Sequence, residues 1–146
     1  MSAELNESGP HQNNKAILVA VSDVFFYTKI RDALLPRGYR LERTRTQQEF
    51  MEKATALRPA AIILNMNDET LDAFRALEQI KGDDRLRAIP VLVFANHEEV
   101  ETWKRAKELG ITKIVSRNEF SSRTRNLVEE VLAVSVQPSA ISQSKS

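Results

Sequence analysis

The sequence contains no cysteine, which excludes disulfide bonds, thiolate nucleophiles and cysteine-ligated metal sites. The 21 Lys and Arg residues are balanced by 20 Asp and Glu, so we expect neither a nucleic-acid partner nor a membrane-surface partner. No apolar run approaches the length of a membrane span. Residues 1–14 are polar and lack the apolar segment of a secretory signal, so we expect a cytoplasmic protein.

Glycine is also scarce, and this bears on nucleotide binding. The four glycines lie in the polar leader or at expected helix ends: Gly9, Gly38, Gly82 and Gly110. Phosphate and dinucleotide sites need glycines in the turn after the first strand, where the backbone approaches the ligand. His11 and His97 are isolated, and no nucleophile and base are spaced for hydrolysis. We therefore expect no enzymatic activity, no cofactor and no bound metal.

Continuous apolar runs are the strongest positive signal. The runs at 16–21, 60–64 and 89–95 predict strands buried on both faces of a parallel sheet. An arginine-rich segment at 39–45 suits an edge strand, and 113–116 predicts a short strand. Helical spacing or capping residues predict five intervening helices. Four of them end before Pro36, Pro59, Gly82 and Gly110, and the fifth covers 121–134. Five strands alternating with five helices imply a doubly wound α/β fold.

Several local signals refine these helices. Thr46 to Glu49 forms a capping-box pattern, and Thr70 is the expected cap of the helix that ends at Gly82. In the helix expected over 98–109, Val100, Trp103 and Ala106 are predicted to face inward. We expect one folded domain at 15–135, a disordered leader at 1–14 and a flexible tail at 136–146.

The central strand ends at Asn65, at the carboxyl edge of the sheet where open α/β folds place their sites. The order and spacing of the elements over 15–134 resemble the receiver domains of two-component response regulators. The segment 84–91, Asp-Arg-Leu-Arg-Ala-Ile-Pro-Val, is also similar to that family's approach to its fourth strand. The resemblance implies a flavodoxin-like (βα)5 fold with strand order 2-1-3-4-5.

The same resemblance assigns the positions of the family's phosphorylation pocket. That pocket has an acid pair after strand 1, a phosphoacceptor aspartate after strand 3, a Thr or Ser after strand 4 and a Lys after strand 5. In this chain the positions are held by Val21, Ser22, Asn65, Ala95 and Arg117. An amide is a poor nucleophile, and the pair at the first two positions offers no carboxylate to Mg²⁺. Ile114 replaces the aromatic switch residue of the family, and Asn118 replaces its proline.

The charges around this degenerate pocket leave two questions open. Asp23 and Asp68 could hold a shifted metal site, or Asp23 could simply be a first-turn helix acid. Arg117 keeps a positive charge that needs water or a carboxylate. We expect it to pair with Asp23 or Asp68 across the pocket, with Asn65 as a neutral acceptor. The alternative is a solvent-facing Arg117 without a partner.

These features favour a pseudo-receiver, a protein-interaction module that does not depend on phosphorylation, in a bacterial two-component or chemotaxis-type system. In receivers the usual docking or dimer face is built from helix 4, strand 5 and helix 5. Here that face would carry Trp103, Lys104, Lys107, Lys113, Arg123 and Arg125. Its expected partner is a signalling protein or a second copy of the chain. A small-ligand-binding flavodoxin-like domain and an oligomerisation scaffold are the alternatives.

Overall fold

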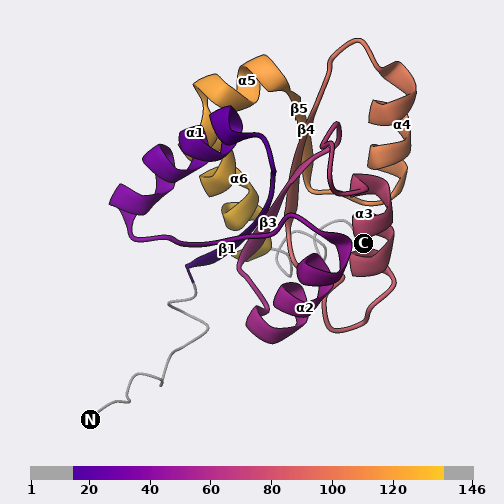
Figure 1. The fold of residues 1–146 in the computed structure, drawn as a ribbon, viewed down its shortest axis with the longest axis horizontal. Helices are drawn as coiled ribbons and strands as arrows, with labels where there is room; N and C mark the ends of the chain where they lie inside the picture. The colour runs from indigo at the N-terminus through magenta and orange to yellow at the C-terminus, as the bar shows by residue number, and fades with distance from the viewer. Residues whose placement is uncertain (1–14, 137–146) are drawn as a thin grey trace.

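A computed structural model describes residues 15–136 of the chain. The leader expected at 1–14 and the tail residues 137–146 lie outside this range. The described residues contain one parallel sheet in the order β2-β1-β3-β4-β5, which confirms the predicted topology (Figure 1). Its strands are β1 (Ala16–Ala20), β2 (Arg40–Arg43), β3 (Ala61–Asn65), β4 (Val91–Ala95) and β5 (Lys113–Ser116).

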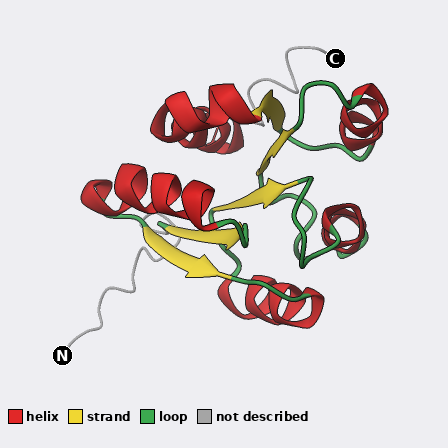
Figure 2. Cartoon of the chain, turned by 45° about the horizontal axis from the view of Figure 1, so that its top comes forward, coloured by secondary structure: helices red, strands yellow, loops and turns green. Residues whose placement is uncertain are grey.

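Helices cover both faces of this sheet (Figure 2). One layer contains α1 (Val24–Leu34), α5 (Arg117–Ser122) and α6 (Thr124–Val136), with the short 3-10 helix η2 (Leu35–Arg37) after α1. The other layer contains α2 (Gln47–Leu57), α3 (Ala73–Lys81) and α4 (Val100–Glu108). Within the described range no helix combines the length and apolar character needed to span a bilayer.

Alternation along the strands explains the two layers. In β1, Ile17 and Val19 pack under α1 and α6, whereas Leu18 and Ala20 pack under α2 and α3. Because both faces are covered, every residue of β1, β3 and β4 is buried. This burial accounts for the continuous apolar runs that predict these strands in the sequence.

Three phenylalanines close the core beneath the carboxyl edge of the sheet. Phe94 of β4 stacks on Phe120 of α5, with ring centroids 4.2 Å apart and an interplanar angle of 16°. Phe26 of α1 lies against Phe94 with a centroid distance of 4.8 Å. All three are buried. The cluster fixes the start of α1 and the start of α5 relative to the central strands.

Local capping follows the sequence signals at two helix ends. The predicted capping box of α2 is present: Glu49 N donates to Thr46 Oγ1 at 3.1 Å, and Arg45 N donates to Glu49 Oε1 at 2.9 Å. The bond from the Arg45 backbone holds the pKa of the Glu49 carboxyl below its usual value. Gly38 ends η2 with a φ of 88°, in the left-handed region that glycine adopts without strain.

The start of α3 differs from the prediction. The helix begins at Ala73, and Asp72 rather than Thr70 is its cap, accepting a hydrogen bond from Arg75 N at 3.1 Å. Thr70 is used elsewhere, because its backbone and hydroxyl both donate to Asp68 Oδ2. The loop after β3 is therefore longer than the sequence pattern indicates.

The final helix predicted at 121–134 is two helices, α5 and α6. Ser116 Oγ accepts a hydrogen bond from Glu119 N at 3.0 Å and starts α5 directly after β5. The chain leaves helical geometry at Arg123, where φ is −131°. Arg117, expected at a strand end, thus lies in the first turn of a helix.

The inner face of α4 is also narrower than predicted. Val100 is 70% exposed, whereas Ala106 is buried and Trp103 is half-buried. Residues six apart on a helix are separated by about 120° around its axis, so Val100 and Ala106 cannot face the same way. The expectation that Val100 faces inward is wrong.

Candidate functional site

The five pocket positions do meet at the carboxyl edge of the sheet, but two of them serve packing. Val21 and Ala95 are fully buried and belong to opposite core layers. The other three border a hollow of about 260 Å³, which we call the edge hollow. It is lined by Ser22, Asp23, Asn65, Asn67, Asp68, Glu69 and Arg117.

Asn65 is committed to the backbone of the next loop. The residue is only 6% exposed, and its Oδ1 accepts a hydrogen bond from Asn67 N at 2.9 Å. Asn67 Oδ1 in turn accepts from Asn96 N at 2.8 Å, and Asn67 Nδ2 donates to Glu99 Oε1 at 2.9 Å. This asparagine chain joins the loop after β3 to the loop after β4. Asn65 therefore positions the loop after β3.

Asp68, which also lines the edge hollow, accepts several hydrogen bonds from two loops. Its Oδ1 accepts from Ser22 N at 2.7 Å and from Ser22 Oγ at 3.0 Å. Its Oδ2 accepts from the backbone N–H groups of Thr70 and Leu71, each at 3.1 Å. A carboxylate that receives several donors is well satisfied without a counter-ion. Asp68 thus ties the loop after β3 to the loop after β1.

Arg117 does not make the tie that the sequence predicts. Its guanidinium carbon lies 5.3 Å from the centre of the Phe26 ring, and the residue is exposed. Between residues 15 and 136 no carboxylate lies within ion-pair distance of Arg117. Asp68 is already occupied by Ser22 and the following loop. The expected pairing with Asp23 or Asp68 is therefore wrong, and Arg117 faces solvent.

The donor set does not fit Mg²⁺, which takes oxygen ligands in near-octahedral geometry and is usually held through at least one carboxylate. Asp23 Oδ1 accepts from Phe26 N at 3.1 Å, so Asp23 is the N-cap of α1 and lies just before the first turn in which the sequence pattern places it. Ser22 Oγ donates to Asp68, and Val21 has no ligand atom in its side chain. Across the described part of the chain, no group of three or more His, Asp or Glu side chains is arranged to hold a metal ion. The two acids of the shifted site are both engaged within the protein, Asp23 as the cap of α1 and Asp68 by Ser22 and the loop after β3.

The proposed docking face is only partly assembled as the sequence predicts. Trp103 packs against the core, and its Nε1 donates to Asn96 O at 3.0 Å. Lys104 and Lys107 are exposed on α4. Ile114, at the switch position, is a half-buried aliphatic residue that packs against the same core layer as Trp103.

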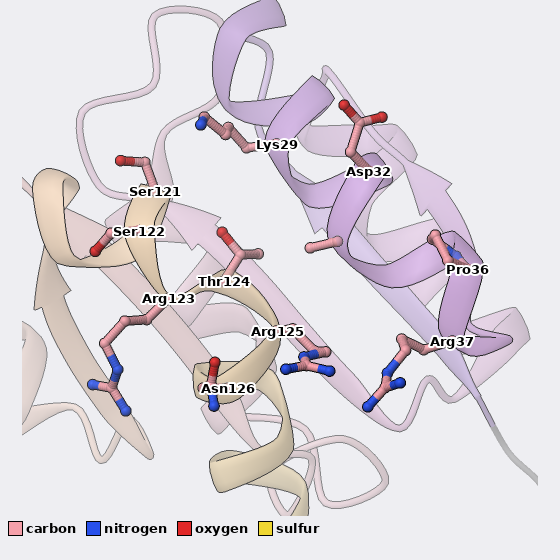
Figure 3. A pocket seen from close by; sticks show the side chains of 11 residues that line it. Lys29, Asp32, Pro36, Arg37, Ser121, Ser122, Arg123, Thr124, Arg125 and Asn126 are labelled. Carbon is pink, nitrogen blue, oxygen red and sulfur yellow. The ribbon is translucent and has the colours of Figure 1, made fainter.

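The cations beyond α4 divide into two groups. Lys113 and Arg123 both pair with Glu130, at 3.7 Å and 2.5 Å, and so form a closed ion-pair cluster beside β5. Arg125 lines a groove between α1 and the start of α6, which Arg37 and Arg123 also line; its side chain points toward Arg37, whereas that of Arg123 points away (Figure 3).

Comparison with known proteins supports the fold assignment. Neither family models nor curated protein sequences match this chain. Among solved structures, NtrX from Brucella abortus matches with a TM-score of 0.76 and 18% identity over 88% of this chain and 29% of NtrX. A putative response regulator from Chloroflexus aurantiacus matches with a TM-score of 0.73 and 15% identity over 82% of this chain and 98% of that one.

A third structure has the same fold. The phosphorylated cyanobacterial phytochrome response regulator RcpA matches with a TM-score of 0.72 and 22% identity, covering 83% of this chain and 96% of RcpA. The chain thus spans less than a third of NtrX and nearly all of the other two proteins. At these identities the likeness concerns the fold alone. The described residues have the flavodoxin-like fold of response-regulator receiver domains.

Proposed function

We propose that this protein is a receiver-like interaction module of a bacterial two-component or chemotaxis-type signalling system, and that it binds its partner without phosphorylation. One observation carries the proposal. The phosphoacceptor position is held by Asn65, a buried amide whose oxygen is committed to Asn67 N. Such a group can neither form an acyl phosphate nor contribute charge to a metal site. The module acts through its surface and is not an enzyme.

The arrangement of the loops supports this proposal. The loops after β1 and β3 are joined by the bond from Ser22 N to Asp68, and the loops after β3 and β4 by the bond from Asn96 N to Asn67. These contacts lie within the protein and need neither a phosphoryl group nor a metal ion. The edge of the sheet is therefore already organised in the unmodified chain, as a partner-binding module requires.

Acetyl phosphate with Mg²⁺ should leave the intact mass of the protein unchanged, and the Asn65→Asp variant should also remain unlabelled. Phosphoryl transfer depends on positioning and on neutralising charge, and a single new carboxylate supplies only the nucleophile. Adding Val21→Asp and Ser22→Asp should permit slow labelling, because a metal-ligand set is then present. Intact-mass spectrometry measures each step. Efficient labelling of the Asn65→Asp variant alone would contradict the proposal.

Reversing the charges of Lys104 and Lys107 to Glu should abolish capture of the partner protein from native cytoplasm. Both side chains are exposed, so the free energy of unfolding should change by no more than about 1 kcal/mol, mainly because Lys107 lies in the last turn of α4. The matched control is Arg37→Glu with Arg125→Glu, which reverses two cations in the groove between α1 and α6.

Capture by the unmodified protein should be equal with and without acetyl phosphate, as judged by quantitative mass spectrometry of the bound fraction. A partner that binds only after phosphodonor treatment would refute phosphorylation-independent binding. Loss of capture in the Arg37→Glu/Arg125→Glu control alone would move the docking face to the opposite side of α6.

A further inference from the structure

A second hollow lies next to the edge hollow, on the other side of Arg117. It has a volume of about 420 Å³ and is open to solvent along the surface between the first turn of α1, the loop after β4 and α5. Figure 1 shows α5 close to the start of α1 at this edge of the sheet. We call it the Phe25 groove; it is lined by Phe25, Phe26, Asn96, His97, Arg117, Asn118 and Ser121.

The apolar part of the Phe25 groove is exposed but firmly supported. Phe25 is 58% exposed, and Val24 beside it is 70% exposed. The Phe25 ring stands edge-on to the buried Phe26, with a centroid distance of 5.2 Å and an interplanar angle of 84°. Since Phe26 packs on Phe94, the exposed ring rests on the fixed core. Neighbouring exposed apolar side chains on such a support are typical of a protein-binding surface.

The charge of the Phe25 groove is of one sign. Arg117 is its permanent cation, and none of the lining residues is acidic. Lys29 adds a second cation at the margin, with its Nζ 5.6 Å from the Phe25 ring centre. The nearby acids Asp23 and Asp68 line the edge hollow instead and are engaged as a helix cap and a loop tie. A carboxylate entering the groove would meet Arg117 without competition from a bound acid.

Two neutral donors complete the polar part of the site. Asn96 and Asn118 border the groove. Within residues 15–136, the side-chain NH₂ group of neither asparagine donates a hydrogen bond. Asn96 Oδ1 accepts from Glu98 N at 3.0 Å, a bond that holds the amide in place at the start of α4. Both asparagines can therefore donate to an incoming acceptor beside Arg117.

We propose that the Phe25 groove binds a segment of a partner protein in which a carboxylate stands next to a large apolar side chain. This inference rests on the proposed function and identifies the chemistry of the partner. The carboxylate would accept hydrogen bonds from Arg117, and the apolar side chain would cover the exposed ring of Phe25. A simple anion would leave the exposed aromatic surface unused. Because the groove is open to solvent, it suits a peptide segment rather than an enclosed small molecule.

Fluorescence anisotropy with the full-length chain tests this proposal. The probe is a short fluorescein-labelled peptide containing Phe and Leu flanked by Asp and Glu. Two control peptides carry Asn and Gln in place of the acids, or Ser in place of Phe and Leu. The acidic, apolar peptide should bind about tenfold or more tightly than either control, since each loses one of the two interactions. Raising the salt concentration should weaken binding, because Arg117 is exposed.

Two variants locate the binding site. Arg117→Glu should reduce affinity at least tenfold, and Phe25→Ala should reduce it by a similar factor. Arg117 lies in the first turn of α5, where an acid is favourable, so the loss would not reflect unfolding. The matched controls are Arg75→Glu and Val134→Ala, an exposed cation on α3 and an exposed apolar residue, neither of which lines the groove. These controls should leave the affinity unchanged.

The outcomes separate the possible occupants. Absence of binding, or binding that is unaffected by Arg117→Glu and Phe25→Ala, would overturn the proposal. If Glu4→Gln with Glu7→Gln in the full chain strengthens peptide binding, the groove is occupied by the chain's own leader and a separate partner is refuted. Self-association that depends on Arg117 would assign the groove to a second copy. If the peptide does not bind but the protein still captures its partner without a phosphodonor, this proposal is refuted and the proposed function stands. If the partner is captured only after phosphodonor treatment, the proposed function itself is refuted.

Discussion

Phe94→Ala should lower the free energy of unfolding by about 3–5 kcal/mol, the range found when a buried phenylalanine is truncated. Phe94 is fully buried and stacks on Phe120 at a centroid distance of 4.2 Å. Its removal would leave a cavity that the neighbouring Phe26 cannot fill without moving α1. Because small domains are stable by only about 5–15 kcal/mol, the variant should be close to its folding limit. Urea unfolding monitored by circular dichroism measures the change.

Phe25→Ala is the matched control for this substitution. The residue precedes Phe26 and has the same side chain, but it is 58% exposed. Its loss should cost less than about 1 kcal/mol, since surface substitutions have small effects. Similar costs for the two variants would mean that the stacked cluster of Phe26, Phe94 and Phe120 does not hold the carboxyl edge of the sheet as the structure indicates.

Asp68→Ala should lower the free energy of unfolding by about 2–3 kcal/mol, because several donors lose their acceptor at once. These donors are Ser22 N, Ser22 Oγ, Thr70 N, Thr70 Oγ1 and Leu71 N. Backbone amides at Ser22, Thr70 and Leu71 should also exchange faster with solvent deuterium, as the loops after β1 and β3 separate. Thermal unfolding and hydrogen exchange followed by NMR are the two measurements.

Asp23→Ala provides the comparison for Asp68. Asp23 accepts a single capping hydrogen bond, from Phe26 N, so its loss should cost about 1 kcal/mol. Exchange in the loop after β3 should be unaffected. If Asp68→Ala costs no more than Asp23→Ala and leaves the amide of Ser22 protected, the tie across the edge hollow contributes little to stability.

The layers and strands could be predicted from sequence because they follow from burial. A strand covered on both faces must be apolar throughout, and β1, β3 and β4 are the clearest apolar runs of the chain. The short strand β5 was predicted with the bounds that the structure shows. The start of a helix was harder to predict from sequence where two polar residues could each serve as its N-cap. At α3 both Thr70 and Asp72 fit the pattern, and only the fold reveals that Thr70 is taken by Asp68.

The segment directly after β5 contains a helix-start signal that the pattern of apolar residues obscures. Ser116 and Glu119 have the spacing of a capping pair, which predicts a helix starting immediately after β5. The environment of Arg117, in contrast, could not be deduced from residue spacing. Its pairing depended on whether a nearby carboxylate was free, and the loop backbone around Asp68 satisfies that carboxylate first. Competition among neighbouring donors is a property of the folded loop.

The tie between Ser22 and Asp68 also restricts how this chain could evolve toward a metal-dependent switch. A first carboxylate introduced at position 22 would stand against Asp68, with which Ser22 Oγ now shares a hydrogen bond at 3.0 Å. Without a bound cation the two like charges would repel, so this step is unfavourable on its own. A change at Asp68 first would instead break the loop. The free energy of folding therefore opposes a first change at either of these two positions.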